Sequence, residues 1–248
     1  PSFAFDYPHV YEDCDDPLCT WKSWTDDWNA VKTLGSITGS SGKKYWTQPL
    51  IVNVEQLPDG SFALGISDRF SYQMGSSNYE PLAIDGVGYY TGWVAGDTLL
   101  VCKTAGGWER ESGTTGAACG TNYSSTRSDP WSSNPTTEFF YDNYGGSHAE
   151  TTIGGLAYAN GQLAVASMDP ADYFLGGVRW ISTTTGDQTN ALNLTPKKQL
   201  SSDTGFGKSA GMGDLEAICD GSPLQIGNRI WYDLDHNGIQ DPDELPVV

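Results

Sequence analysis

The segment VNVEQLPDGSFALGISDR, residues 52–69, alternates apolar and polar side chains on either side of a Pro-Asp-Gly turn. Alternation places every second side chain on the same face of a strand, so the segment predicts two antiparallel strands joined by a tight turn. The segment GDTLLVCKTAGGWERES, residues 96–112, has the same form around Gly-rich residues and predicts a second hairpin. We therefore expect a four-stranded antiparallel sheet, with a loop between its two hairpins.

The same arrangement recurs about a hundred residues later in the chain. TIGGLAYANGQLAVASMDP, residues 152–170, repeats the first hairpin, and GGVRWISTTTGDQTNALNL, residues 176–194, takes the place of the second. The alignment matches identical residues in pairs: Gly60 with Gly161, Ala63 with Ala164, and Asp68 with Asp169. The repeat therefore predicts two units of four antiparallel strands, which are typical of the blades of a β-propeller.

The number of repeats leaves two architectures open. A propeller usually closes with at least four blades, whereas this sequence contains two units, with SAGMGDLEAICD, residues 209–220, as a candidate inner strand of a third. Either the chain is the C-terminal part of a larger propeller, or the repeat builds a different arrangement of two sheets. Both predict an all-β fold, because the chain is rich in strand and turn formers, including 30 Gly and 13 Pro.

The chain is strongly acidic, with 31 Asp and Glu against 13 Lys and Arg and a net charge of −18. Such a surface repels nucleic acid and anionic membranes, which are bound through Lys and Arg. No window approaches the roughly 20 apolar residues of a membrane span. We therefore expect neither nucleic acid as a partner nor a membrane span, and we predict an exported, extracellular or cell-surface protein.

The chain contains five cysteines, and their spacing favours an oxidising compartment outside the cell. Cys14 and Cys19 bracket a short acidic segment, and Cys102 and Cys119 flank Gly-rich turns about a hairpin apart. Neither pair has the spacing of a redox or zinc motif, so both pairs are predicted to form local disulfides. Cys219 is left over, as a buried thiol or as the partner of a cysteine elsewhere.

The clearest chemical motif is DLDHNGIQDPDE, residues 233–244, which fits the twelve-residue calcium loop. Calcium takes six to eight hard oxygen ligands, and a tight loop gathers them without help from distant residues. Gly238 stands at the sixth position, where the turn is sharpest. The predicted calcium ligands are Asp233, Asp235, Asn237, the backbone carbonyl of Ile239, Asp241 and the carboxylate of Glu244. The alternative is an ordinary turn rich in Asp, Asn and Gly.

The residues around this loop do not predict the two helices of an EF-hand. The preceding segment IGNRIWY, residues 226–232, is rich in β-branched and aromatic side chains and predicts a strand. Pro242 and Pro246 disfavour a helix after the loop. We therefore expect an EF-hand-like loop on a β scaffold.

With its loop, this strand resembles the start of the B-type domains of serine-aspartate repeat adhesins, the SdrD B-like family, over residues 226–244. The resemblance implies a calcium-stiffened β-sandwich module of a surface adhesin or stalk, and it implies the same ligand set. The sequence departs from the family in that the later strands of the sandwich are missing. The preceding run GFGKSAGMGDLEAICDGSPLQ also resembles large exported bacterial proteins in which a propeller-like region leads into such a module.

An enzyme is a weaker hypothesis. The three histidines are far apart in sequence, and no motif of a hydrolase or nucleotide-binding loop is present. Acidic pairs for glycoside hydrolysis could be drawn from Asp68, Asp169, Asp214 and Glu216. Strand-end carboxylates more often accept hydrogen bonds from backbone amides or pair with a nearby cation such as Arg69.

Aromatic residues offer a third class, a carbohydrate-binding module. The candidates for stacking on sugar rings are Trp21, Trp24, Trp28, Trp46, Tyr89, Tyr90 and Trp93. Such side chains more often fill a β core or an interface. Asn122 and Asn193 lie in glycosylation acceptor patterns, which also arise by chance.

Together these patterns predict a propeller-like domain over residues 1–223 and a truncated SdrD B-like calcium-binding segment over residues 224–248. The predicted role is structural or adhesive, as a calcium-stabilised, non-enzymatic segment of a larger assembly or filament. Its expected partners are other copies of itself or other cell-surface proteins, with glycans as a further candidate.

Overall fold

A computed structural model of the chain describes residues 20–34, 42–44, 46–81, 89–92, 96–105, 107–111, 119, 139–144, 148, 150–195 and 213–218. The chain divides into two compact units, Pro1–Ala217 and Ile218–Val248. The predicted boundary between residues 223 and 224 stays a prediction. The strand and calcium loop of the predicted sandwich module lie outside the described residues. In the described part, no helix is long and apolar enough to cross a membrane.

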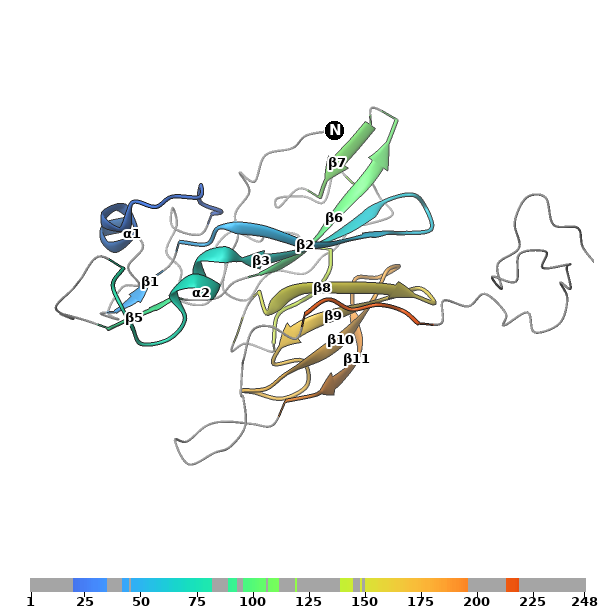
Figure 1. The fold of residues 1–248 in the computed structure, drawn as a ribbon. Helices are drawn as coiled ribbons and strands as arrows, with labels where there is room; N and C mark the ends of the chain where they lie inside the picture. Colours follow the sequence, from blue (N-terminus) through green and yellow to red (C-terminus); the bar gives the residue numbers. More distant parts are fainter. Residues whose placement is uncertain are drawn as a thin grey trace, which may run out of the picture. The chain divides into compact units, whose positions relative to one another are not determined.

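Two four-stranded antiparallel sheets form the centre of the first unit (Figure 1). The first sheet contains β2 (Pro49–Gln56), β3 (Phe62–Asp68), β6 (Asp97–Thr104) and β7 (Gly107–Arg110). The second contains β8 (Thr152–Ala159), β9 (Gln162–Met168), β10 (Gly176–Ser182) and β11 (Gln188–Asn193). In both sheets the strands lie in the order in which they occur in the chain. The all-β prediction and the two four-stranded antiparallel units are therefore confirmed.

The repeated residues of the two units occupy equivalent places. Gly60 and Gly161 lie in the turns after the first strand of each sheet, with φ of 86° and 77°. This left-handed conformation suits glycine because it has no Cβ. Asp68 ends β3 and Asp169 directly follows β9, so the alignment found in the sequence matches the structure.

Residues between the two hairpins of the first sheet were predicted to form a loop, and this is wrong for the described ones. They contain helix α2 (Arg69–Met74) and two short strands, β4 (Asn78–Tyr79) and β5 (Tyr89–Gly92). Together with β1 (Lys43–Lys44), β4 and β5 form a small sheet in the order β1-β5-β4. Helix α1 (Trp28–Leu34) packs nearby, because its Trp28 and Val31 share a buried cluster with Phe70 and Met74 of α2.

Both faces of the two central strands of the first sheet, β3 and β6, are buried. One face contributes Ala63, Leu100 and Cys102 to a core shared with Leu156 and Val165 of the second sheet. The alternate residues Leu64, Ile66, Leu99 and Val101 of the same strands form a second cluster on the other face, together with Trp21. A strand that is buried on both faces is usually a nearly continuous apolar run, and β6 contains the run Leu-Leu-Val-Cys.

The two sheets approach each other closely at glycines. A Cβ added to Gly65 of β3 would lie 1.9 Å from the carbonyl oxygen of Gly154 in β8. A Cβ added to Gly96 would lie 1.8 Å from the carbonyl oxygen of Thr152. Backbone therefore packs on backbone between the sheets, and only glycine leaves enough room.

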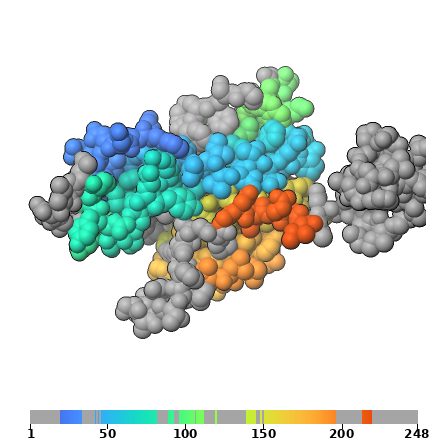
Figure 2. Space-filling view, viewed as in Figure 1, coloured from blue at the N-terminus to red at the C-terminus, as the bar shows by residue number. Residues whose placement is uncertain are grey.

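Residues 213–217 lie against the first strands of both sheets. Figure 1 shows them, in red-orange, beside β8, and Figure 2 shows them at the surface between the light-blue and orange segments. Asn53 of β2 joins the three segments, since its Nδ2 donates to the carbonyl oxygen of Leu156 at 2.9 Å and to Oδ1 of Asp214 at 2.5 Å. This segment is the one predicted as the inner strand of a third unit. Its described residues, 213–218, form no strand.

Candidate functional site

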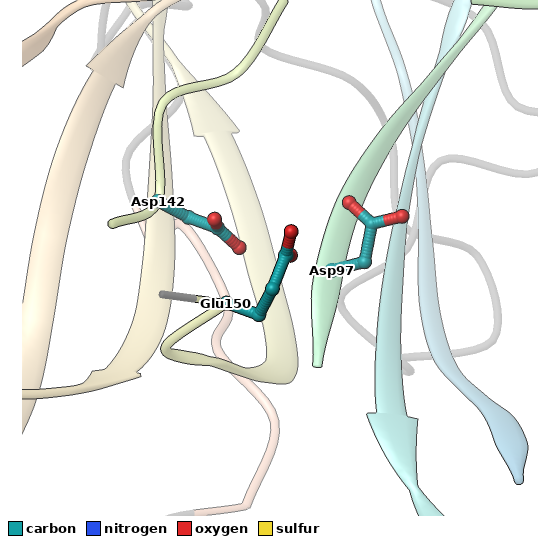
Figure 3. A group of neighbouring side chains, drawn as sticks. All are labelled: Asp97, Asp142 and Glu150. Carbon is teal, nitrogen blue, oxygen red and sulfur yellow. The ribbon is translucent and has the colours of Figure 1, made fainter. Parts of the chain in front are cut away.

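Three buried carboxylates meet where the two sheets adjoin (Figure 3). Asp97 is the first residue of β6, Asp142 follows the buried pair Phe139 and Phe140, and Glu150 precedes β8. One oxygen from each carboxylate lies within 4.8 Å of the other two. We call these three residues the acidic cluster.

Backbone and hydroxyl hydrogen bonds hold the acidic cluster in place. The N–H of Gly96 donates to the carbonyl oxygen of Glu150 at 3.1 Å, which ties the start of β6 to the residues before β8. The N–H and hydroxyl of Thr151 both donate to the carbonyl oxygen of Asp142. Glu150 itself has φ of 53°. This conformation is rare for a residue with a side chain, and the N–H of Glu150 donates to Oδ1 of Asn143 at 2.8 Å.

Arg179 of β10 lies beside this segment and is completely buried. Its guanidinium donates to the carbonyl oxygen of Asn143 at 3.1 Å and to the hydroxyl of Thr151 at 2.8 Å. Its Nε donates to the hydroxyl of Ser167 at 3.1 Å. The planar guanidinium of Arg179 therefore connects β9, β10 and the segment that contains Asp142. A buried network of this kind stabilises one arrangement of the chain when each polar group in it has a hydrogen-bond partner.

The aligned aspartates terminate their strands in different ways. Oδ1 of Asp68 accepts hydrogen bonds from the N–H groups of Gln48 and Phe70, both at 2.9 Å, and so caps α2. Oδ1 of Asp169 accepts from the N–H of Leu175 at 3.1 Å, and its other oxygen contacts the imidazole of His148. Both aspartates therefore accept hydrogen bonds from the backbone where their strands end, as expected of residues that stabilise the fold.

Burial changes the proton affinity of two carboxyl groups of the first sheet. It raises the pKa of Asp68 to about 8, although the N–H donors of Gln48 and Phe70 oppose the shift. Burial also raises the pKa of Glu111 to about 7, helped by the nearby charge of Asp142. Glu111 accepts hydrogen bonds from the N–H groups of Leu100 and Phe139, so a fourth carboxyl group adjoins the acidic cluster.

The other two acidic residues considered for hydrolysis lie at the surface. Asp214 and Glu216 are exposed and face Glu55 of β2. Burial raises the pKa of Glu55, and the charges of Glu216 and Asp214 add to the shift. The structure therefore brings Asp214 and Glu216 together with Glu55, and it places Asp68 and Asp169 in separate, buried positions.

The remaining predicted site residues divide into those that the structure describes and those that it does not. Cys102 and Cys119 form the predicted disulfide, with a Cα–Cα distance of 5.3 Å. Cys14, Cys19 and Cys219 lie outside the described residues, as do the predicted calcium ligands Asp233, Asp235, Asn237, Ile239, Asp241 and Glu244. Of the aromatic candidates, Trp21 and Trp28 are buried, Trp24 and Tyr89 are exposed, Trp46 and Tyr90 are partly buried, and Trp93 is not described.

Sequence reasoning missed the acidic cluster. The three residues lie in separate parts of the chain and belong to no motif. A weak signal exists, because Asp97 lies two residues before an apolar run and Asp142 follows the aromatic run Phe139–Tyr141. A charged residue beside such apolar runs is expected to be buried with polar partners.

Deep burial limits what the acidic cluster can do. Three carboxylate oxygens at this spacing could bind one hard cation such as calcium or magnesium. A catalytic carboxyl group must contact its substrate, whereas Asp97, Asp142 and Glu150 are at most 4% exposed. These three carboxylates therefore have little access to a substrate in solution.

The chain is similar to three colossins of Dictyostelium discoideum. Colossin-B is 30% identical over 233 residues, which are 91% of this chain and 5% of Colossin-B. Colossin-C is 33% identical over 110 residues, 42% of this chain and 11% of Colossin-C. Colossin-A is 30% identical over 159 residues, 60% of this chain and 1% of Colossin-A. The chain thus spans a small part of the length of these relatives. No protein-family profile matches the chain, and no solved structure gives a significant match.

Proposed function

We propose that this chain is a structural module of an extracellular or cell-surface protein, stabilised by calcium and part of a larger assembly. The observation that carries the proposal is the pair of packed sheets with a buried polar network and the Cys102–Cys119 disulfide. Disulfides persist in oxidising compartments and are rare in the cytosol. The packed sheets, the buried hydrogen bonds and the disulfide each make the module more rigid.

The similarity to colossins supports a modular role. It covers 91% of this chain and only 5% of Colossin-B. A region that forms a small part of a much longer protein is typical of one module in a chain of several. The burial of the acidic cluster supports a non-enzymatic module, since a substrate has little access to its carboxylates.

The compartment is tested on the protein from intact cells. A membrane-impermeant amine-reactive biotin reagent should label it, and peptide mapping without reduction should recover Cys102 linked to Cys119. An intracellular marker protein controls for leakage. Recovery of the protein only from the unlabelled interior, with both cysteines alkylated as free thiols, would refute an extracellular role.

Calcium stabilisation rests on the loop of residues 233–244. Extracellular calcium modules bind with dissociation constants of roughly 10⁻⁴ to 10⁻³ M. Calorimetric titration of the full chain with calcium should show such a site, and the double variant Asp233→Ala, Glu244→Ala should lose it. Asp243→Ala is the matched control, because it removes a charge from the same loop at a position that supplies no ligand. Equal affinities in the wild type and the double variant would contradict the proposed site.

Assembly with other copies is the remaining part of the proposal. The strand predicted at residues 226–232 is apolar enough to pair with a second chain through β-augmentation. Sedimentation in millimolar calcium should show larger species for the full chain than for a chain that ends at Pro223. A full chain that stays monomeric, with no change on truncation, would exclude assembly through this segment.

A further inference from the structure

A groove lies beside the small sheet, between α1, α2 and the residues that precede α1. Figure 2 shows residues 20–34, in blue, against the teal segment that contains α2. Two hollows of about 280 Å³ each form the groove, and Thr25, Asp26 and Arg69 line both of them. Each hollow is close to the lower end of the range for small-molecule sites, roughly 300–1,000 Å³.

The floor and the rim of this groove differ in character. Trp28, Val31, Phe70 and Met74 line it and are all buried, so the floor is apolar and fixed. Glu80 holds the indole of Trp28 by accepting a hydrogen bond from its Nε1 at 2.7 Å. The rim is polar and carries Thr25, Asp26, Arg69 and Gln73.

Trp24 provides an exposed aromatic surface at one end of the groove. Its Nε1 donates to the carbonyl oxygen of Pro49 at 3.0 Å, and the Arg69 guanidinium lies 4.5 Å from its ring centre. These two contacts hold the indole in one orientation, yet 57% of the residue remains exposed. An aromatic ring that is both fixed and exposed loses little entropy when a ligand stacks on it.

The rim offers hydrogen-bonding groups that the described part of the chain does not use. Arg69 donates from Nη1 to Oε1 of Gln48 at 2.6 Å, and its guanidinium makes no other hydrogen bond to the described residues. The side chains of Asp26 and Gln73 make no hydrogen bond to the described residues. A guanidinium, a carboxylate and an amide together can both donate to and accept from hydroxyl groups.

We propose that this groove binds a neutral oligosaccharide, with one sugar ring stacked on Trp24 and its hydroxyl groups hydrogen-bonded to Asp26, Arg69 and Gln73. A pyranose ring has an apolar face that suits an indole and a rim of hydroxyl groups that suits polar side chains. Asp26 and Arg69 carry opposite charges, so the groove itself has no strong preference for an ion. The net charge of −18 disfavours polyanionic sugars.

The test is calorimetric titration of the full chain with cellohexaose, mannohexaose, xylohexaose and chitohexaose, and with hexagalacturonate as the acidic comparison. At least one neutral hexaose should bind with saturation. Trp24→Ala should weaken that binding about tenfold or more through loss of the stacked ring, and Trp24→Phe should restore part of it. Gln73→Ala should weaken it about threefold.

The matched control is Tyr79→Ala, which removes an aromatic side chain that is 54% exposed and does not line the groove. This control variant should bind the same neutral hexaose with the affinity of the wild type. If Trp24→Ala fails to fold, as thermal unfolding would show, Gln73→Ala still tests the groove, because Gln73 is exposed. Absence of binding to all four neutral hexaoses, binding to hexagalacturonate alone, or unchanged affinity in Trp24→Ala and Gln73→Ala would overturn the proposal. None of these outcomes depends on the calcium loop or the disulfide, so the proposed structural role would be unaffected.

Discussion

Replacing Gly65 with alanine should separate the two sheets and destabilise the first unit strongly. The added Cβ would lie 1.9 Å from the carbonyl oxygen of Gly154 and 2.9 Å from Cγ of Leu156. An ordinary contact begins at 3.4 Å, so the backbone of β8 would have to move. Gly65 pairs with Asn53 on one side and Thr98 on the other, and its own strand therefore cannot shift without breaking both ladders.

Two opposing contributions set the size of the effect. Alanine restricts the unfolded chain more than glycine does, which stabilises the fold by about 0.5–1 kcal/mol. Overpacking a core usually costs about 1–3 kcal/mol, and a clash with backbone belongs at or above the upper end because no side chain can rotate away. We expect Gly65→Ala to lower the free energy of unfolding by about 2–3 kcal/mol.

The assay is urea unfolding followed by the fluorescence of the 9 tryptophans. Gly161→Ala is the matched control: its φ is 77°, but nothing lies within 4 Å of an added Cβ. It should cost only about 1–2 kcal/mol of backbone strain. A Gly65→Ala protein within about 0.5 kcal/mol of wild type, the usual spread for harmless surface changes, would refute the close packing of the two sheets.

Three further predictions concern residues of the first unit. Cys119→Ser opens the link to Cys102 across 17 residues and should cost about 3 kcal/mol in urea unfolding, and an unchanged midpoint would argue against the disulfide. Because burial raises the folded-state pKa of Asp68 to about 8, the folded chain keeps a proton that the unfolded chain has released. Stability should therefore fall as the pH rises from about 4 to 8; Asp68→Asn should make this fall shallower, and an identical slope would contradict the assignment. Arg179→Lys keeps the charge but loses the planar fork and should cost about 3 kcal/mol; stability equal to wild type would show that the fork is not needed.

Local patterns predicted the parts of the fold that depend on neighbours in sequence. The hairpins followed from alternation and from the turns at Gly60 and Gly161, which fix which residues of each strand face the same way. The Cys102–Cys119 disulfide was predicted from its spacing, although the β6–β7 hairpin pairs Cys102 with Glu109 and Cys119 lies beyond β7. The strand order of each sheet needed no long-range information, because both sheets connect consecutive strands.

Long-range contacts were beyond such patterns. The acidic cluster joins Asp97, Asp142 and Glu150 only because the two sheets pack together at Gly65 and Gly154. Helix α2 has 6 residues, too few for a helical period to stand out from the neighbouring strand. The groove at Trp24 likewise combines residues before α1 with residues of α2, so its aromatic ring could be suspected from the sequence, but its polar partners could not.

The equivalence of Asp68 and Asp169 has a practical consequence for engineering. Both residues mark the point where a unit leaves its second strand on the way to its third, yet the first unit then uses residues 69–96 and the second only residues 170–175. In the first unit this junction contains α2, β4 and β5, and the strand order of the four-stranded sheet is the same as in the second unit. The short connection of the second unit is therefore a suitable place to graft a foreign recognition loop.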